Sequence, residues 1–139
     1  MADAAVLTVA LSPTGALAWP VTGPITSTFG QRDLGWHSGL DIAADMGTLI
    51  GASAAGRVSE ADWKSDGYGY AVMIDHGNGL ETLYGHCSEL LVRPGDWVEA
   101  GEPVARIGST GHSTGPHVHL EVRLDGECRD PLDYLAAQI

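Results

Sequence analysis

His117 and His119 are separated by one residue in a stretch of alternating apolar and polar side chains, which follows Pro116 and predicts a β-strand. Side chains two positions apart on a strand point to the same face, so the two imidazoles are expected to lie side by side. Paired imidazoles are good metal ligands or acid–base groups, although a solvated strand surface would also accommodate them. The pair alone is compatible with both interpretations. Other residues that could bind the same metal ion or take part in the same chemistry would favour the first.

His37 and Asp41 form a second pair that could bind a metal ion. Because they are four residues apart, they share a face in either a strand or a helix, and Gly39 between them keeps that face open. By itself this pair is better explained as a loop histidine and a turn aspartate. Together with His119 it supplies two imidazoles and one carboxylate, the composition of a catalytic zinc site with a fourth position for water. Such a site stays net positive, so the metal can acidify the water and polarise a carbonyl.

A zinc hydrolase also needs a base for the attacking water and a donor for the oxyanion. The sequence contains no His-Glu-x-x-His motif that would provide a glutamate base. His117, on the same strand face as His119, and His86, at the end of its own predicted strand, are the natural candidates for these two roles.

Short strands joined by tight turns must position these residues. Nineteen glycines, seven prolines and a single phenylalanine favour this architecture over a helix bundle. Strand-like runs occur at residues 25–29, 48–52, 57–63, 70–75, 80–86 and 117–124. The Asn78-Gly79 turn makes residues 70–86 a hairpin, and Asp125-Gly126 connects the last run to a short return strand.

The remaining segments complete a mostly β fold with an antiparallel sheet core. Residues 30–36 form a polar loop, and residues 92–108 are expected to be a two-stranded, barrel-sandwich-like unit. Residues 130–135 predict a short C-terminal helical turn, with Asp130 as its N-cap and Pro131 at its first position.

Composition and charge limit the possible functions. Hydrophobic residues make up 44% and charged residues 18% of 139 residues, which is typical of one globular domain. The formal net charge of −11 disfavours nucleic-acid binding, and no apolar run approaches the length of a transmembrane helix. We expect one domain at residues 19–139, preceded by an N-terminal tail or edge strand at residues 1–18.

The first residues only weakly match a secretory signal. An apolar run at residues 4–11 precedes Pro13 and Gly15, but the Met-Ala-Asp start contains no lysine or arginine. The segment is therefore not a convincing signal peptide, and an edge strand or the tail of a longer protein explains it better.

Three motifs resemble the M23 family of zinc metallopeptidases, the lysostaphin-type or LytM-like peptidoglycan endopeptidases. They are His37-Ser-Gly-Leu-Asp41, Tyr84-Gly85-His86 and Gly111-His-Ser-Thr-Gly-Pro-His117-Val-His119-Leu-Glu. The segments Pro20-Val-x-Gly-x-Ile-Thr-Ser-x-Phe-Gly and Asp130-Pro131-Leu132 match the family as well. The resemblance extends over residues 19–135, nearly the whole chain.

The resemblance implies the lysostaphin-type fold, with an open groove on the sheet that is walled by loops. It implies one Zn²⁺ per chain on His37, Asp41 and His119, with His86 and His117 as catalytic residues. It also implies hydrolysis of peptidoglycan stem or cross-bridge peptides by a zinc-activated water. The enzyme would be secreted, periplasmic or phage-delivered. All five metal-ligand and catalytic positions of the family carry the expected residue, which argues against an inactive regulatory member. An open groove favours a monomer. Which histidine is the base stays open.

Two alternative functions remain. A zinc D,D-carboxypeptidase would act on the same wall peptides with a similar site. A non-catalytic barrel-sandwich module is also conceivable, because Pro-Gly-Asp-x-Val-x-x-Gly at residues 94–101 resembles biotinyl or lipoyl carrier domains. Those carriers need a lysine on an exposed hairpin, and the one lysine of the chain, Lys64, is outside such a turn.

The groove walls are predicted to include Tyr68, Tyr70, His112 and Thr114. Tyr68 and Tyr70 lie in or beside the flexible turn at residues 64–69, where at least one aromatic side chain, Trp63 included, should belong to the core. His112 is better explained by a structural loop role, and local turn hydrogen bonds explain Thr114 equally well.

Three further side chains are predicted to lie outside the chemistry. His76 falls in the hairpin turn and is expected to be solvated. Cys87 points away from the site if it lies on a strand. Cys87 and Cys128 form no Cys-x-x-Cys pair, and the sequence leaves open whether they are free thiols or one disulfide.

Overall fold

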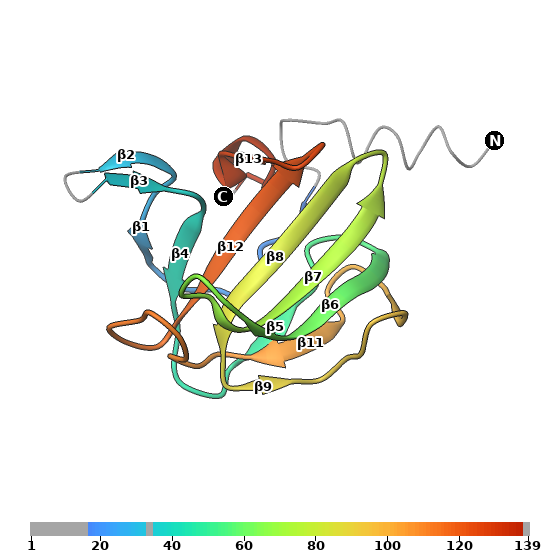
Figure 1. Cartoon of the computed structure of the whole chain (residues 1–139), viewed down its shortest axis with the longest axis horizontal. Coiled ribbons are helices and arrows are strands. Elements are labelled where there is room, and N and C mark those ends of the chain that lie inside the picture. The colour runs from blue at the N-terminus through green and yellow to red at the C-terminus, as the bar shows by residue number, and fades with distance from the viewer. Residues whose placement is uncertain (1–16, 33–34, 138–139) are drawn as a thin grey trace.

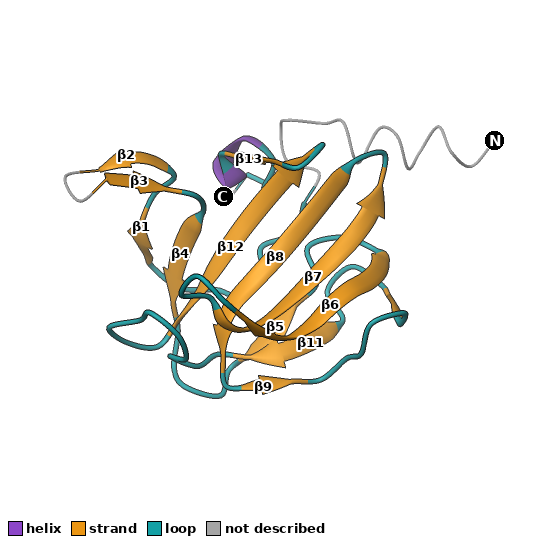
Figure 2. Cartoon of the chain, viewed as in Figure 1, coloured by secondary structure: helices purple, strands orange, loops and turns teal. Residues whose placement is uncertain are grey.

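The computed structural model describes residues 17–32 and 35–137, in which almost every element is a strand (Figure 2). An eight-stranded antiparallel sheet dominates, and Figure 1 shows β12, β8, β7 and β6 side by side across it. Its order is β1 (Ile25–Ser27), β4 (Leu40–Ala43), β12 (His117–Leu124), β8 (Leu80–Cys87), β7 (Gly69–Gly77), β6 (Gly56–Lys64) and β10 (Trp97–Val98), with β13 (Glu127–Arg129) paired to β12. The predicted mostly β, antiparallel fold is confirmed.

Smaller elements surround this sheet. A three-stranded sheet has the order β5 (Leu49–Gly51), β11 (Pro103–Arg106) and β9 (Glu89–Leu90), and a ribbon pairs β2 (Gly30–Arg32) with β3 (Gly35–His37). The 3₁₀ helix η1 (Pro131–Asp133) begins as predicted, because the Asp130 carboxylate accepts a hydrogen bond from the Leu132 N–H at 3.0 Å. In the described part of the chain, no helix has the length and apolar character needed to span a membrane.

Strand alternation gives the large sheet one face that packs into the core and one opposite face. On β12, Leu120 and Val122 are fully buried in the core, as is Tyr84 of β8. Ile50 of β5 and Val104 of β11 belong to the same core cluster, so the small sheet packs on this face. The residues between them on β12 therefore project from the opposite face of the sheet.

Leu17 ties the beginning of the described chain to its end. It is fully buried and forms a parallel bridge with Leu135, with a hydrogen bond from Leu17 N–H to the Tyr134 carbonyl at 2.9 Å. Residues 1–16, most of the segment predicted as a tail or edge strand, lie outside the described residues.

Residues 92–108 do not form the predicted two-stranded unit. β10 pairs with β6 in the large sheet, whereas β11 pairs with β5 and β9 in the small sheet. The prediction was wrong because turn residues mark where a strand ends but not which strand it joins.

Residues 30–36, predicted as a polar loop, contain most of the β2–β3 ribbon. Gly30 pairs with His37 and Arg32 with Gly35, so the ribbon carries the first predicted metal ligand at its end. Its strands are short and expose polar side chains, so they show no apolar alternation from which they could be recognised.

The hairpin at residues 70–86 is confirmed as β7 and β8, with Asn78 of its turn at a φ of 56°. β7 continues to Gly77, two residues beyond the predicted end at residue 75, so His76 belongs to the strand and not to the turn. Alternation from Val72 and Ile74 then places His76 on the core face, where it is 8% exposed. The prediction of a solvated His76 is therefore wrong.

Candidate metal and active site

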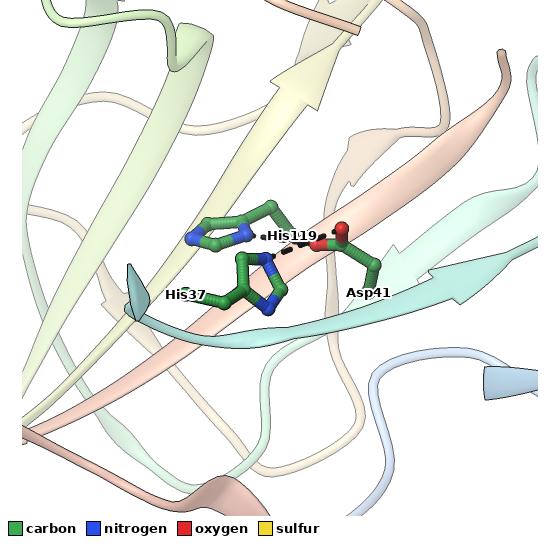
Figure 3. Close-up of side chains that lie close together, drawn as sticks. All are labelled: His37, Asp41 and His119. Atoms are coloured by element: carbon green, nitrogen blue, oxygen red, sulfur yellow. Dashed lines mark hydrogen bonds and ion pairs between the residues drawn. The ribbon is translucent and has the colours of Figure 1, made fainter. Parts of the chain in front are cut away.

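Neighbouring strands bring the predicted metal ligands together (Figure 3). Asp41 of β4 is directly opposite His119 of β12, so both side chains leave the same face of the sheet. The Asp41 Oδ1 atom lies 2.8 Å from His119 Nδ1, and His37, at the end of β3, places its Nε2 3.3 Å from Asp41 Oδ2. One donor atom from each residue lies within 4.8 Å of the other two.

Gly39 allows the chain to pass closely beside His119. A Cβ at this position would collide with the carbonyl oxygen of Leu120 and lie 2.9 Å from His119 Cε1. Any side chain here would therefore push against β12 and against a predicted metal ligand.

His86 and His117 lie next to these three residues. Their ring centroids are 4.7 Å apart, and the His86 ring is 5.9 Å from that of His119. The Nε2 atom of His117 lies 3.8 Å from Asp41 Oδ1. The structure thus brings all five predicted metal and catalytic residues into one cluster.

A backbone irregularity turns His86 toward the cluster. Tyr84 and Cys87 are both fully buried in the core, so regular alternation cannot hold for the two residues between them. His86 has a φ of 64° and the register of β7 and β8 shifts nearby, which fits an inserted residue that lets both Gly85 and His86 face away from the core. Positive φ in a non-glycine residue costs energy and is concentrated at functional sites.

Each imidazole of the cluster is held through one ring nitrogen and presents the other. A carbonyl or carboxylate oxygen can only accept, so the anchoring nitrogen carries the proton. The anchors are His37 Nδ1 to the Thr28 carbonyl at 2.9 Å, His86 Nδ1 to the Thr110 carbonyl at 2.7 Å, His117 Nδ1 to the Gly115 carbonyl at 2.8 Å, and His119 Nε2 to the Glu121 carboxylate at 2.9 Å. Each of the four rings is therefore oriented by one nitrogen, and the second nitrogen of His119 contacts the Asp41 carboxylate at 2.8 Å.

Electrostatics favour a cation among these residues. Burial alone would raise the pKa of Asp41, but its hydrogen bond to His119 and the charges of the nearby histidines lower it overall. Burial alone would lower the pKa of His119, yet its hydrogen bonds to Asp41 and Glu121 raise it to about 9. His86 differs, because burial lowers its pKa despite the bond to the Thr110 carbonyl, which keeps this imidazole neutral near pH 7.

A buried polar group that the sequence did not single out lies behind His119. The Glu121 Oε2 atom is 2.9 Å from His119 Nε2 and accepts hydrogen bonds from Ser38 Oγ and the Tyr68 hydroxyl, each at 2.6 Å. Its Oε1 atom is 2.7 Å from Nη2 and 2.9 Å from Nε of Arg123. The same two-residue period that paired His117 with His119 extends to both Glu121 and Arg123, so the signal was present in the sequence.

The cluster opens into a cavity of about 550 Å³. Tyr68, His112 and Thr114, three of the four residues predicted to wall a substrate groove, line it together with Arg32 and Trp36 of the β2–β3 ribbon. The two loops that carry Tyr68 and His112 are joined by a hydrogen bond, because the His112 N–H donates to the Gly67 carbonyl at 2.8 Å.

Tyr70 does not line this cavity. It is 42% exposed and packs edge-on against Trp63 with ring centroids 5.2 Å apart. β7 begins only at Gly69, so strand alternation does not relate Tyr70 to Tyr68. Neither Tyr70 nor Trp63, which is 55% exposed, belongs to the core.

The three predicted ligands fit zinc by their donor chemistry. Two imidazole nitrogens and one carboxylate oxygen, each close to the others, form a three-ligand set of the kind that leaves a coordination position open. The nitrogens that face the Asp41 carboxylate are Nε2 of His37 and Nδ1 of His119, and zinc binding there would release the proton that His119 Nδ1 shares with Asp41.

The model of peptidase family M23 matches residues 35–131, which include all five clustered residues. The chain belongs to this family. Peptidases of the family are in general zinc-dependent, so the donor set found here is the one expected of an M23 domain.

Curated relatives are longer than this M23 domain. It is 39% identical over 127 residues to the murein hydrolase activator EnvC of Escherichia coli, covering 89% of this chain and 30% of the relative. It is 48% identical over 96 residues to the DD-carboxypeptidase/endopeptidase Mpg of Neisseria meningitidis, covering 69% of this chain and 22% of the relative. The chain thus spans less than a third of the length of either protein.

Solved structures agree with the fold. The catalytic domain of the antimicrobial peptidase lysostaphin from Staphylococcus simulans superposes with a TM-score of 0.76 at 29% identity, covering 81% of this chain and 91% of that one. A zinc-containing peptidase from Vibrio cholerae gives 0.77 at 29% identity, covering 87% of this chain and 39% of that one. The predicted lysostaphin-type architecture is confirmed.

Cys87 and Cys128 are free cysteines. Cys87 is fully buried in the core, so it points away from the cavity, and burial raises its pKa to about 12. Cys128 is partly exposed, and its Sγ atom lies 3.6 Å from Glu121 Oε1. Of the alternatives left open by the sequence, the structure has the two free thiols.

Proposed function

We propose that this M23 domain is a zinc-dependent endopeptidase that hydrolyses peptide bonds in the stem or cross-bridge peptides of peptidoglycan. The completeness of the cluster supports this most strongly. Three candidate zinc ligands and two oriented histidines face one cavity. A domain that only binds the wall or a partner would have no need of this arrangement.

His37, Asp41 and His119 would hold the zinc ion. When bound there, zinc supplies a Lewis acid that polarises the scissile carbonyl and lowers the pKa of a water molecule. The anchored rings of His37 and His119 keep the ligand nitrogens directed at the site without a rearrangement on binding. Asp41 contributes the negative charge that attracts the cation.

His86 and His117 would handle the protons. Each presents Nε2, because Nδ1 is bound to a backbone carbonyl. One of them accepts a proton from the attacking water, and the other, in its protonated form, donates to the oxyanion. As the peptide C–N bond breaks, a proton passes to the leaving amine. We leave the base unassigned, since both rings present the same nitrogen.

The substrate proposal rests on the cavity and on the relatives. Trp36 lines the cavity and is 64% exposed, so it offers an apolar surface to an extended peptide. EnvC and Mpg carry names that refer to murein or its D,D-peptides, which supports a wall peptide as substrate. We therefore propose that the enzyme acts outside the cytoplasm, secreted, periplasmic or phage-delivered, and as a monomer.

A D,D-carboxypeptidase is the second candidate, because Mpg is named for both activities. The two reactions differ in their products. An endopeptidase cuts within the cross-linked peptide and separates its two strands, whereas a carboxypeptidase releases a single terminal D-amino acid. A non-catalytic activator, as the name of EnvC suggests for that protein, would release neither.

The test combines zinc content by elemental analysis with digestion of purified peptidoglycan, with and without a chelator. We expect stoichiometric zinc and chelator-sensitive release of new amino termini from cross-linked peptides. His119→Ala should lose zinc, whereas His117→Ala should keep zinc and lose turnover by about 10²- to 10⁴-fold. Full activity in His117→Ala would refute its role, and zinc binding without any cleavage by the wild-type chain would refute the endopeptidase.

A further inference from the structure

Glu121 contacts the one ring nitrogen of His119 that faces away from the predicted metal position. Nδ1 of His119 faces Asp41 and Nε2 faces Glu121, at 2.8 and 2.9 Å respectively. The Glu121 carboxylate is paired with Arg123, so it accepts the hydrogen bond that His119 Nε2 donates.

Two hydroxyl groups fix the position of this carboxylate. Ser38 Oγ and the Tyr68 hydroxyl both donate to Oε2, the oxygen that also contacts His119. Burial and the neighbouring Glu121 raise the pKa of Tyr68 to about 12, so the phenol stays protonated and can donate. Tyr68 thus both lines the cavity and donates its hydroxyl hydrogen to Glu121.

Arg123 balances the charge of Glu121. Two guanidinium nitrogens bind Oε1, and the carboxylate is fully buried while the arginine side chain is 21% exposed. An uncompensated second carboxylate beside Asp41 would reduce the net positive charge of a zinc-loaded site and so weaken its action on a carbonyl. With Arg123 in place, Glu121 orients His119 without that effect.

We propose that Glu121 is a positioning residue that fixes His119 as its Nε2–H tautomer and so reserves Nδ1 for zinc, with Arg123 neutralising its charge. The metal in this inference rests on the proposed function. The acceptor that orients His119 is supplied by the chain itself, two residues further along the same strand.

The test compares two substitutions of Glu121 in the full chain. In Glu121→Gln the amide oxygen still accepts from His119 Nε2 but the ion pair with Arg123 is lost, whereas Glu121→Met removes acceptor and ion pair together. We expect Glu121→Met to bind zinc about 10- to 100-fold more weakly in a chelator competition assay, and Glu121→Gln to stay much closer to wild type. Glu127→Gln and Glu127→Met, on an exposed glutamate that pairs only with Arg129 among the described residues, are the matched controls.

Equal losses in the Gln and Met variants would overturn the inference, because they would mean that only the ion pair matters. Nitrogen-15 spectra of the histidine rings in the zinc-loaded wild type test it without any substitution, should Glu121→Met fail to fold. Zinc on Nδ1 and a proton on Nε2 of His119 are expected, and zinc on Nε2 would refute the inference. Zinc bound through Nδ1 in a chain that cleaves no peptide would refute the proposed endopeptidase and support this inference.

Discussion

Acidification below neutral pH is expected to destabilise the fold through His76, a buried imidazole outside the metal site. Its Nδ1 donates to the Ala55 carbonyl at 2.8 Å, and its Nε2 lies 2.7 Å from Thr82 Oγ1. Thr82 Oγ1 is 2.6 Å from the Tyr84 hydroxyl, which in turn accepts from the Ser53 N–H at 2.9 Å. The neutral ring fits this chain, with Tyr84 donating to Thr82 and Thr82 donating to Nε2.

A protonated His76 would break this order. Nε2 would then be a donor, so Thr82 would have to donate to Tyr84, and the Tyr84 proton would have to turn away from Thr82 to another acceptor. Burial lowers the pKa of His76 below 6.5, and the Ala55 carbonyl and the Asp75 charge offset this only in part. A lowered folded-state pKa means that the contribution of His76 to stability is complete above about pH 6.5 and is lost as the pH falls through the folded-state pKa.

The size of the effect follows from proton linkage. Between the two pKa values the unfolded chain binds up to one more proton at this residue, so each pH unit costs up to about 1.4 kcal/mol in the free energy of unfolding. Urea unfolding of the metal-free chain at several pH values between 7.5 and 5 measures this dependence. His76→Gln, which cannot titrate, is the comparison, because the site histidines titrate alike in both proteins.

We expect the free energy of unfolding to fall more steeply with acid in the wild type than in His76→Gln. The difference between the two slopes belongs to His76, whatever the absolute cost of the substitution. Parallel pH dependences would show that His76 does not stay neutral in the folded state, and the hydrogen-bond chain described above would then be wrong.

Two further predictions concern the site. Gly39→Ala should lower the free energy of unfolding by roughly 1–3 kcal/mol and weaken zinc binding, because its Cβ would collide with the Leu120 carbonyl and press on His119; an unchanged melting temperature would contradict this. Trp36→Ala should raise KM while changing the unfolding free energy by less than about 0.5 kcal/mol, since Trp36 lines the cavity and is 64% exposed. Trp97→Ala, at a side chain 53% exposed and outside the cavity lining, is its control, and an equal KM effect in both variants would refute a substrate contact.

The sequence predicted strands best where alternation and turn chemistry agree. The β7–β8 hairpin has both signals, an apolar run and Asn78-Gly79, and the structure has it nearly as predicted. The β2–β3 ribbon has neither signal, because its strands are three residues long and its pairing depends on contacts that no local pattern records. Residues 92–108 show a third case, in which turns were recognised but strand partners were not.

The site was predicted partly from physical pattern and partly from resemblance. The common face of His117 and His119 follows from the strand period alone, whereas His86 could be proposed only from its place at the end of a predicted strand, because its orientation depends on a positive φ that contradicts regular alternation. Tyr70 shows the limit of the same rule, since a period of two is informative only within a continuous strand and β7 begins between Tyr68 and Tyr70.

β12 links folding to the chemistry of the site. On one face it carries Leu120 and Val122 into the core, and on the other His119 is followed by Glu121, which is fully buried. A shift of one residue in the register of β12 would exchange the two faces, place His119 in the apolar core and place Leu120 among the polar groups of the opposite face. Because such a shift costs the burial of several apolar side chains, the pattern that selects the fold also selects the register in which His119 faces Asp41. Positioning of the proposed metal ligand therefore depends on the free energy that stabilises the sheet.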